Sequence, residues 1–311
     1  MDTAAGFSVR PRDTGRIVRM HPSSAHRYSS APASVGEPPV SNSQGADLSD
    51  WDALEPDVLD AVTQAMALSA ETRRIYPTIL AQHYGPGALE YLDIYPARQP
   101  DAPVLVFLPG GFGGLPMCAD DFAGVARGPF AHGITTVVVN YAHAPAAPLD
   151  EARRQVGAAI AWVYDNAEQF GADPERIVVA GHAVGAPLAV GAAVTDWEDE
   201  CGVPAGVVTG VVAVSGRFQP HPSTGWAVPP VFDRRVDVPI IVAVGDREPD
   251  EQQRQSGELV DRLTNGGTAV LLDLPGADQH GSFAGYCDAH SPLTLATVAL
   301  ISAGGRSLRV A

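Results

Sequence analysis

The sequence contains no lysine, so all 20 of its cationic residues are arginine. Without a lysine amine the chain cannot form a Schiff base with pyridoxal phosphate or build a Walker-type phosphate loop. It is also poor in cysteine: Cys118, Cys201 and Cys287 are far apart and lack the spacing of a disulfide framework or a zinc site. No motif predicts a cofactor, and we expect no metal site.

Long apolar runs and an apolar signal-peptide core are also missing, which predicts a cytoplasmic protein without a membrane partner. The formal net charge is −16, and the first 50 residues add nothing to it because five Arg balance five Asp or Glu. An acidic folded part repels nucleic-acid backbones and anionic lipid surfaces. The expected partner is therefore a small molecule rather than a nucleic acid or a membrane. The sequence leaves a homodimer open.

The chain divides into an extension and one expected domain. Residues 1–50 are rich in Ser, Pro, Ala, Gly and Arg without periodicity, which predicts a flexible extension or, alternatively, a docked arm or lid. In residues 51–311 strands and helices alternate, and the central strands are unbroken Val, Ile and Leu runs, typical of a parallel sheet covered on both faces. We expect a doubly wound α/β fold with its ligand site at the carboxyl ends of the strands. The segment 217–237 interrupts the alternation and is a candidate rim or specificity insertion.

The helices of this pattern are expected at 120–132, 149–170, 250–265 and 291–304, with a further one starting at 183. In the second of these helices Val156, Ile160 and Val163 form one buried stripe, and Gly171 is the expected stop.

The stretch "RIVVAGHAVGAPLAV" has the order strand, G-x-x-x-G, helix, which is the frame of a nucleophile elbow. In such an elbow a serine sits on a strained turn, and the amide after it helps to bind an oxyanion. Here Ala183 occupies the nucleophile position and has no reactive group, while Val184 supplies the following amide. We expect His182 to pack inside the elbow rather than to act as a base.

A second strand end, "VFLPGGFGG", places a glycine-rich turn directly after a buried strand. Backbone N–H groups of Gly110 and Gly111 are candidate oxyanion donors in such a turn. An ordinary tight turn is the alternative interpretation.

Two strand ends after the elbow carry a candidate acid and a candidate base. "PIIVAVGDREPD" puts Glu248 three residues after the strand end at Gly245, with Asp246 and Asp250 as rivals. "LLDLPGADQHGSF" delivers His280 from a loop, and His290 is the only other histidine after the last strand. The chain order nucleophile position, acid, histidine is that of a hydrolytic triad built on a strand–turn–helix elbow.

These motifs resemble α/β-hydrolases of the arylformamidase (kynurenine formamidase-like) and hormone-sensitive-lipase-like esterase group, over about residues 51–304. The stretches "YGPGALEYLDIYPA", "PVLVFLPGGF", "VVVNYAHAP", "GDREPDEQQRQS" and the elbow segment all carry the likeness. The resemblance implies an α/β-hydrolase fold, a triad at Ala183, Glu248 and His280, and oxyanion donors at Gly110, Gly111 and Val184. Pro109 and Ala183 depart from the group, which has His and Ser there.

Three interpretations of Ala183 remain open. The chain is a serine esterase or amidase in an inactivated, substrate-trapping form, or a natural non-hydrolytic enzyme of the same fold, or a binding protein without catalysis. In the second case His280 is a general base and the glycine-rich loop stabilises an enolate, as an epimerase, isomerase or cyclase would require.

The rim loops contain large apolar residues that predict a pocket for an aromatic or acyl substrate. These candidates are Phe112, Met117, Phe218, Trp226, Phe232, Phe283 and Tyr286.

Overall fold

The computed structural model describes residues 56–111, 117–143, 147–219, 236–264 and 269–304. The extension at 1–50 and most of the candidate insertion at 217–237 lie outside the described residues. Within the described part of the chain, no helix is both long and apolar enough to cross a membrane.

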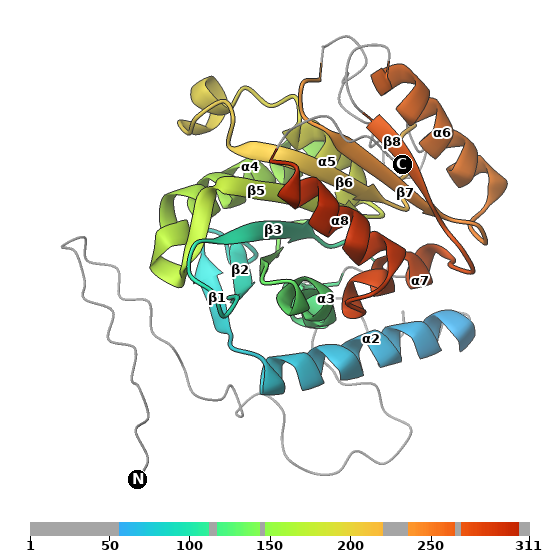
Figure 1. Ribbon diagram of the computed structural model, residues 1–311, viewed down its shortest axis with the longest axis horizontal. Helices are drawn as coiled ribbons and strands as arrows, with labels where there is room; N and C mark the ends of the chain where they lie inside the picture. The colour runs from blue at the N-terminus through green and yellow to red at the C-terminus, as the bar shows by residue number, and fades with distance from the viewer. Residues whose placement is uncertain (1–55, 112–116, 144–146, 220–235, 265–268, 305–311) are drawn as a thin grey trace.

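One eight-stranded sheet forms the centre of the molecule, in the order β1-β2-β4-β3-β5-β6-β7-β8 (Figure 1). β2 runs antiparallel to both of its neighbours, and all other neighbouring strands are parallel. The strands are β1 (Ile79–His83), β2 (Tyr91–Tyr95), β3 (Ala102–Leu108), β4 (Thr135–Val139), β5 (Ala172–His182), β6 (Val208–Val214), β7 (Ile240–Gly245) and β8 (Ala269–Leu274). The expected doubly wound, mostly parallel sheet is confirmed.

Helices cover both faces of the sheet. One face carries α4 (Leu149–Asn166), α5 (Gly185–Ala192), α6 (Asp250–Thr264) and the short turn η3 (Trp197–Cys201). The other face carries α2 (Pro56–Ile75), η1 (Ala119–Ala126), α3 (Arg127–Ala131), α7 (Gln279–Ala284), η5 (Gly285–Cys287) and α8 (Pro292–Ser302).

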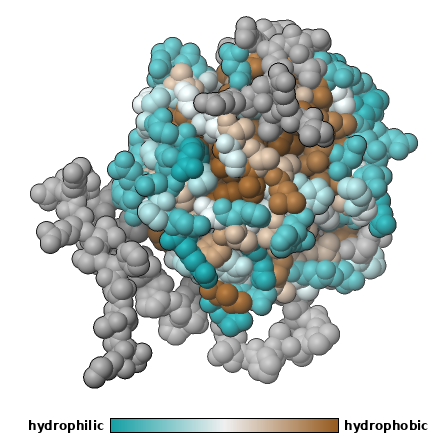
Figure 2. All heavy atoms as spheres, in the orientation of Figure 1, coloured by the Kyte–Doolittle hydropathy of each residue, from teal (hydrophilic) through white to brown (hydrophobic). Residues whose placement is uncertain are grey.

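On the side seen in Figure 2, hydrophobic residues reach the surface in the middle of the view, with hydrophilic residues around them.

The two helical layers explain why the central strands read as unbroken apolar runs. In β3, Val104 and Val106 belong to the core under α4 and α5, whereas Leu105 and Phe107 belong to the opposite core. Successive side chains of a strand point to opposite faces, so a strand between two apolar layers needs an apolar residue at every position.

Local differences from the expected helices have local causes. The buried stripe on α4 is confirmed, but the helix ends at Asn166, and a 3₁₀ turn, η2 (Ala167–Phe170), leads to Gly171 at φ 75°. The segment expected as one helix at 120–132 consists of the 3₁₀ helix η1 followed by α3. α5 begins at Gly185 instead of residue 183, because Ala183 lies in the turn before the helix.

Candidate active site

The turn between β5 and α5 has the backbone strain of a nucleophile elbow. Ala183 has φ 51°, in the left-handed region that residues with a Cβ rarely adopt. Its N–H donates to the carbonyl of Val214 on β6 (3.0 Å), and its own carbonyl accepts from the N–H of Ala186 (3.2 Å). The strained turn expected at this position is therefore present, with a methyl group where a serine elbow has its hydroxyl.

Close backbone contacts explain the two glycines of the elbow. A Cβ on Gly181 would lie 2.1 Å from the carbonyl oxygen of Gly185. A Cβ on Gly185 would lie 2.2 Å from the carbonyl oxygen of Leu108, at the end of the neighbouring strand β3. Strand, turn and helix can pack this closely only if both positions lack a side chain.

The glycine-rich turn after β3 lies directly against the elbow. Leu108 pairs with Gly181 in the sheet, and a Cβ on Gly110 would lie 2.7 Å from the Ala183 Cβ. The Tyr141 hydroxyl donates to the carbonyl of Pro109 (2.6 Å), which anchors the start of this turn to the end of β4. Gly110 is therefore beside the nucleophile position, as an oxyanion loop requires. Oxyanion binding by Gly110, Gly111 and Val184 stays a prediction.

Glu248 is the buried carboxylate at this edge of the sheet, with a side chain that is 3% exposed. Its Oε1 accepts three hydrogen bonds: from the Ser215 hydroxyl (2.6 Å), the Gly245 N–H (2.7 Å) and the Ser282 hydroxyl (2.9 Å). Its rivals Asp246 and Asp250 are both exposed. Burial and hydrogen bonding thus favour Glu248 as the acid.

His280 lies in the first turn of α7, so the expectation that a loop delivers it was wrong. Asp278 caps this short helix, because its Oδ1 accepts from the N–H groups of His280 (3.0 Å) and Gly281 (2.7 Å). A capping aspartate supplies an acceptor for amides that have no partner within the helix. The rival His290 has a side chain that is 89% exposed, and its Nδ1 lies 3.8 Å from Asp288 Oδ1.

Two side-chain bonds tie the helix of His280 to the rest of the site. The Ser282 hydroxyl reaches Glu248, and Nε2 of His182 donates to the carbonyl of Gln279 (2.8 Å). His182 is fully buried with its ring 4.8 Å from that of Phe283, and burial lowers its pKa to about 4. It is therefore neutral at pH 7 and packs inside the elbow as expected.

Sequence reasoning missed Ser215, Ser282 and Tyr141. Ser215 directly follows the apolar run of β6 and has φ 52°, so two adjacent strands, β5 and β6, are both followed by a left-handed residue. A polar residue at the end of a buried strand is the sequence signal that could have identified Ser215. Nothing in the local sequence indicates that Ser282 reaches Glu248.

Four of the candidate pocket residues belong to described parts of the chain, and all four lie in the apolar cores. Met117, Phe218, Phe283 and Tyr286 are each at most 4% exposed, and they pack in the two apolar cores. Phe283 and Tyr286 belong to α7 and η5 rather than to loops, which corrects the expectation for them. Their contact with a substrate stays a prediction, and Phe112, Trp226 and Phe232 lie outside the described residues.

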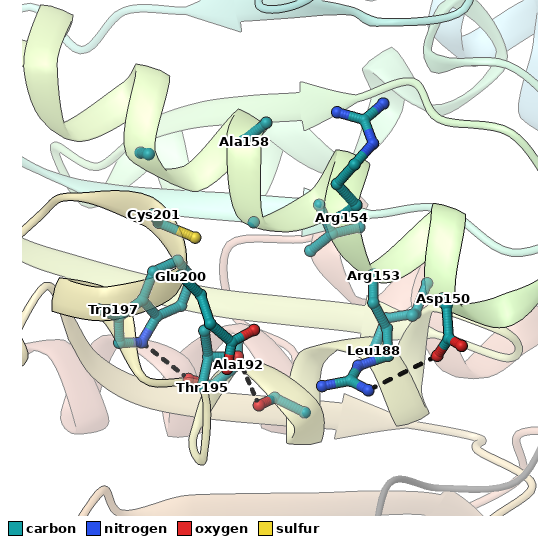
Figure 3. Close-up of a pocket in the computed structure, with 14 residues that line it drawn as sticks. Asp150, Arg153, Arg154, Ala158, Leu188, Ala192, Thr195, Trp197, Glu200 and Cys201 are labelled. Atoms are coloured by element: carbon teal, nitrogen blue, oxygen red, sulfur yellow. Dashed lines mark hydrogen bonds and ion pairs between the residues drawn. The ribbon is translucent and has the colours of Figure 1, made fainter.

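A cavity of about 530 Å³ lies between α4, α5 and η3 (Figure 3) and is not lined by the elbow, Glu248 or His280. Asp150 and Arg153 stand at one end of it, and Trp197, Glu200 and Cys201 stand at the other. None of the site residues expected from the sequence lines this cavity.

The sheet order and the strand–turn–helix elbow are those of the α/β-hydrolase fold. Residues 130–228 match a family model described as alpha/beta hydrolase fold. This match includes the elbow but ends before Glu248 and His280.

Similar proteins agree with this fold. Esterase LipQ of Mycobacterium tuberculosis is 34% identical over 119 residues, which cover 36% of this chain and only 28% of that esterase. A thioesterase candidate from Silicibacter sp. TM1040 is structurally similar with a TM-score of 0.66 at 19% identity, covering 83% of this chain and all of that one. Esterase B from Lactobacillus rhamnosis, inhibited by a tributyrin phosphonate, has a TM-score of 0.60 at 16% identity, covering 84% of this chain and 97% of that one.

Proposed function

We propose that this chain binds the carbonyl group of a carboxylic ester or amide at the elbow, as a serine hydrolase does, and that Ala183 prevents its hydrolysis. One observation carries the proposal: the elbow keeps its strained φ of 51° at Ala183, with Gly110 against it, although no nucleophile is present. Strain of this kind persists only where the surrounding structure enforces it, and it is concentrated at active sites.

Each residue has a defined role in this proposal. The amides of Gly110, Gly111 and Val184 hold the carbonyl oxygen, and Glu248 orients the imidazole of His280. With Ser at 183, His280 would take the hydroxyl proton while the oxygen attacks the carbonyl carbon, and it would return that proton to the leaving group. Water activated by His280 would then release the acyl or formyl group. Ala183 removes the first step, so bound substrate stays intact.

The substrate class follows from the resemblance and from the esterase relatives. We propose a small aromatic or acyl substrate, either a carboxylic ester or an N-formyl-arylamine of the kind arylformamidases cleave. The inactivated, substrate-trapping interpretation of the chain belongs to this proposal, as does the expected cytoplasmic location.

The test is the Ala183→Ser variant, assayed with a small aryl ester and with an N-formyl-arylamine. We expect hydrolysis to rise by several orders of magnitude, up to ~10⁶, which is the cost of removing a catalytic serine. Ala193→Ser is the matched control, since it adds the same hydroxyl on the chain just after α5 and should leave the rate unchanged. If Ala183→Ser hydrolyses neither substrate faster than the parent does, the proposal is wrong.

A second candidate function is proton abstraction beside a carbonyl, as in an epimerase, isomerase or cyclase. The observation in its favour is that Glu248 stays buried with three hydrogen-bond donors although no nucleophile needs activation. In this case the parent chain should exchange the α-proton of a bound carbonyl compound with deuterated water, and His280→Ala should abolish the exchange. Tight binding without exchange, and without hydrolysis by Ala183→Ser, would indicate a binding protein.

A further inference from the structure

The hydrogen bonds to Glu248 are distributed unequally between its two oxygens. Oε1 accepts from Ser215, Gly245 and Ser282, three donors that come from three different segments of the chain. Oε2 is buried and has no partner among the described residues. Burying a carboxylate oxygen without a hydrogen-bond donor costs free energy, so the lack of a donor to Glu248 Oε2 among the described residues needs an explanation.

Only one of these donors is a fixed backbone group, the N–H of Gly245. The other two are hydroxyl groups. Ser215 is fully buried, and its carbonyl accepts from the Gln252 side chain (2.6 Å). Ser282 is 1% exposed, and its single hydroxyl proton is shared between Glu248 Oε1 (2.9 Å) and the carbonyl of Asp278 (2.6 Å), the residue that caps α7.

We infer that Ser215 and Ser282 are positioning residues that hold Glu248 by Oε1 and so leave Oε2 available to accept the ring N–H of His280 during the reaction. This inference rests on the proposed function, because it concerns the acid–base pair of that site. Ser282 has a double effect, since it holds the acid and belongs to the same short helix as His280.

Other titratable groups near the pair do not bond to the Glu248 carboxylate. His182 lies close to His280, but burial lowers its pKa to about 4, so it is neutral from pH 5 upward. Asp278 lies on the helix of His280 and points an oxygen at backbone N–H groups rather than at Glu248. Asp246 and Asp250 flank Glu248 in sequence and are exposed.

The first experiment uses the Ala183→Ser protein as the parent and adds Ser215→Ala or Ser282→Ala. Each of these substitutions removes one hydrogen bond to a charged group, so it should lower kcat about tenfold and leave KM unchanged. Ser282→Thr keeps the hydroxyl and should recover most of the rate, whereas the left-handed φ of Ser215 does not suit the branched side chain of threonine.

Ser256→Ala is the matched control. Ser256 is a fully buried serine on α6 whose hydroxyl has no partner among the described residues. Its removal should change neither kcat nor KM. An unchanged kcat in Ser215→Ala and Ser282→Ala, or the same fall in Ser256→Ala, would overturn the inference.

A second measurement needs no catalysis and so separates this inference from the proposed function. In the chain with Ala183, NMR can follow the ring N–H proton of His280. A hydrogen bond to a carboxylate oxygen moves such a proton downfield, so Glu248→Gln and Ser282→Ala should move it back upfield, whereas Ser256→Ala should not. If neither Glu248→Gln nor Ser282→Ala moves this resonance, the inference is wrong even if Ala183→Ser is active. If the resonance moves but Ala183→Ser is inactive, only the proposed hydrolysis fails.

Discussion

Replacing Gly185 by alanine tests the packing of the elbow, because the same substitution has the opposite expected effect at Gly257. Gly257 lies inside α6, where alanine should favour the helix by about 0.5–1 kcal/mol, whereas Gly185 is the first residue of α5 and gains little helix stability from alanine. At Gly257 a Cβ would meet nothing within 4 Å, so Gly257→Ala should stabilise the protein by about that amount.

At Gly185 the added Cβ would lie 2.2 Å from the carbonyl oxygen of Leu108, so β3 and α5 must separate by about 1 Å to restore a normal contact. Overpacking of this kind typically costs about 1–3 kcal/mol. Because the helical gain at this first position is small, we expect Gly185→Ala to lower the free energy of unfolding by about 2 kcal/mol, which corresponds to a fall in Tm of about 4–8 °C.

Urea unfolding followed by circular dichroism measures both variants against the parent chain. The expected result is a lower midpoint for Gly185→Ala and a higher one for Gly257→Ala, with equal slopes. If Gly185→Ala is as stable as Gly257→Ala, the close contact between β3 and the elbow does not exist, and the placement of the glycine-rich turn beside Ala183 fails with it.

Two further predictions concern buried polar groups. Tyr141→Phe removes the bond to the Pro109 carbonyl and should lower the free energy of unfolding by about 1–3 kcal/mol, whereas Tyr95→Phe removes a buried hydroxyl that has no partner among the described residues and should be neutral or stabilising. Calorimetry of both variants checks this, and equal losses would contradict it. His182 has a folded-state pKa of about 4 against about 6.5 unfolded, so between these values only the unfolded state gains a proton and stability is lost as the pH falls. Between pH 7 and pH 5 the free energy of unfolding of His182→Asn should therefore fall by about 2 kcal/mol less than that of the parent chain. Denaturant titrations at the two pH values measure this difference, and an identical pH dependence would refute the reasoning.

Much of the fold could be predicted from the sequence because it depends on local patterns. Unbroken Val and Ile runs identify strands covered on two faces, and the spacing of Val156, Ile160 and Val163 identifies the buried side of α4. The edge strand β1 escaped prediction, since its five residues alternate in burial and include Gln82 and His83.

The site was predictable only in part. Glu248 and His280 follow from their place after strand ends, and burial then separates Glu248 from its neighbours. The bonds that hold Glu248 join residues 33 and 34 positions apart, so no local pattern encodes them. The short helix of His280 was missed because glycine and aspartate after a strand end also predict a loop. Its six residues are too few to show a periodic apolar pattern.

Two anchors of the site end on main-chain carbonyl groups: Tyr141 on Pro109, and His182 on Gln279. Every amino acid carries such a carbonyl, so mutations at positions 109 and 279 can accumulate without loss of either bond. The tolerance is one-sided, because Tyr141 and His182 supply their bonds from side chains and cannot be exchanged as freely. Pro109 stands where the group that the chain resembles has histidine. Its carbonyl still accepts the bond from Tyr141, so the turn beside Ala183 stays anchored.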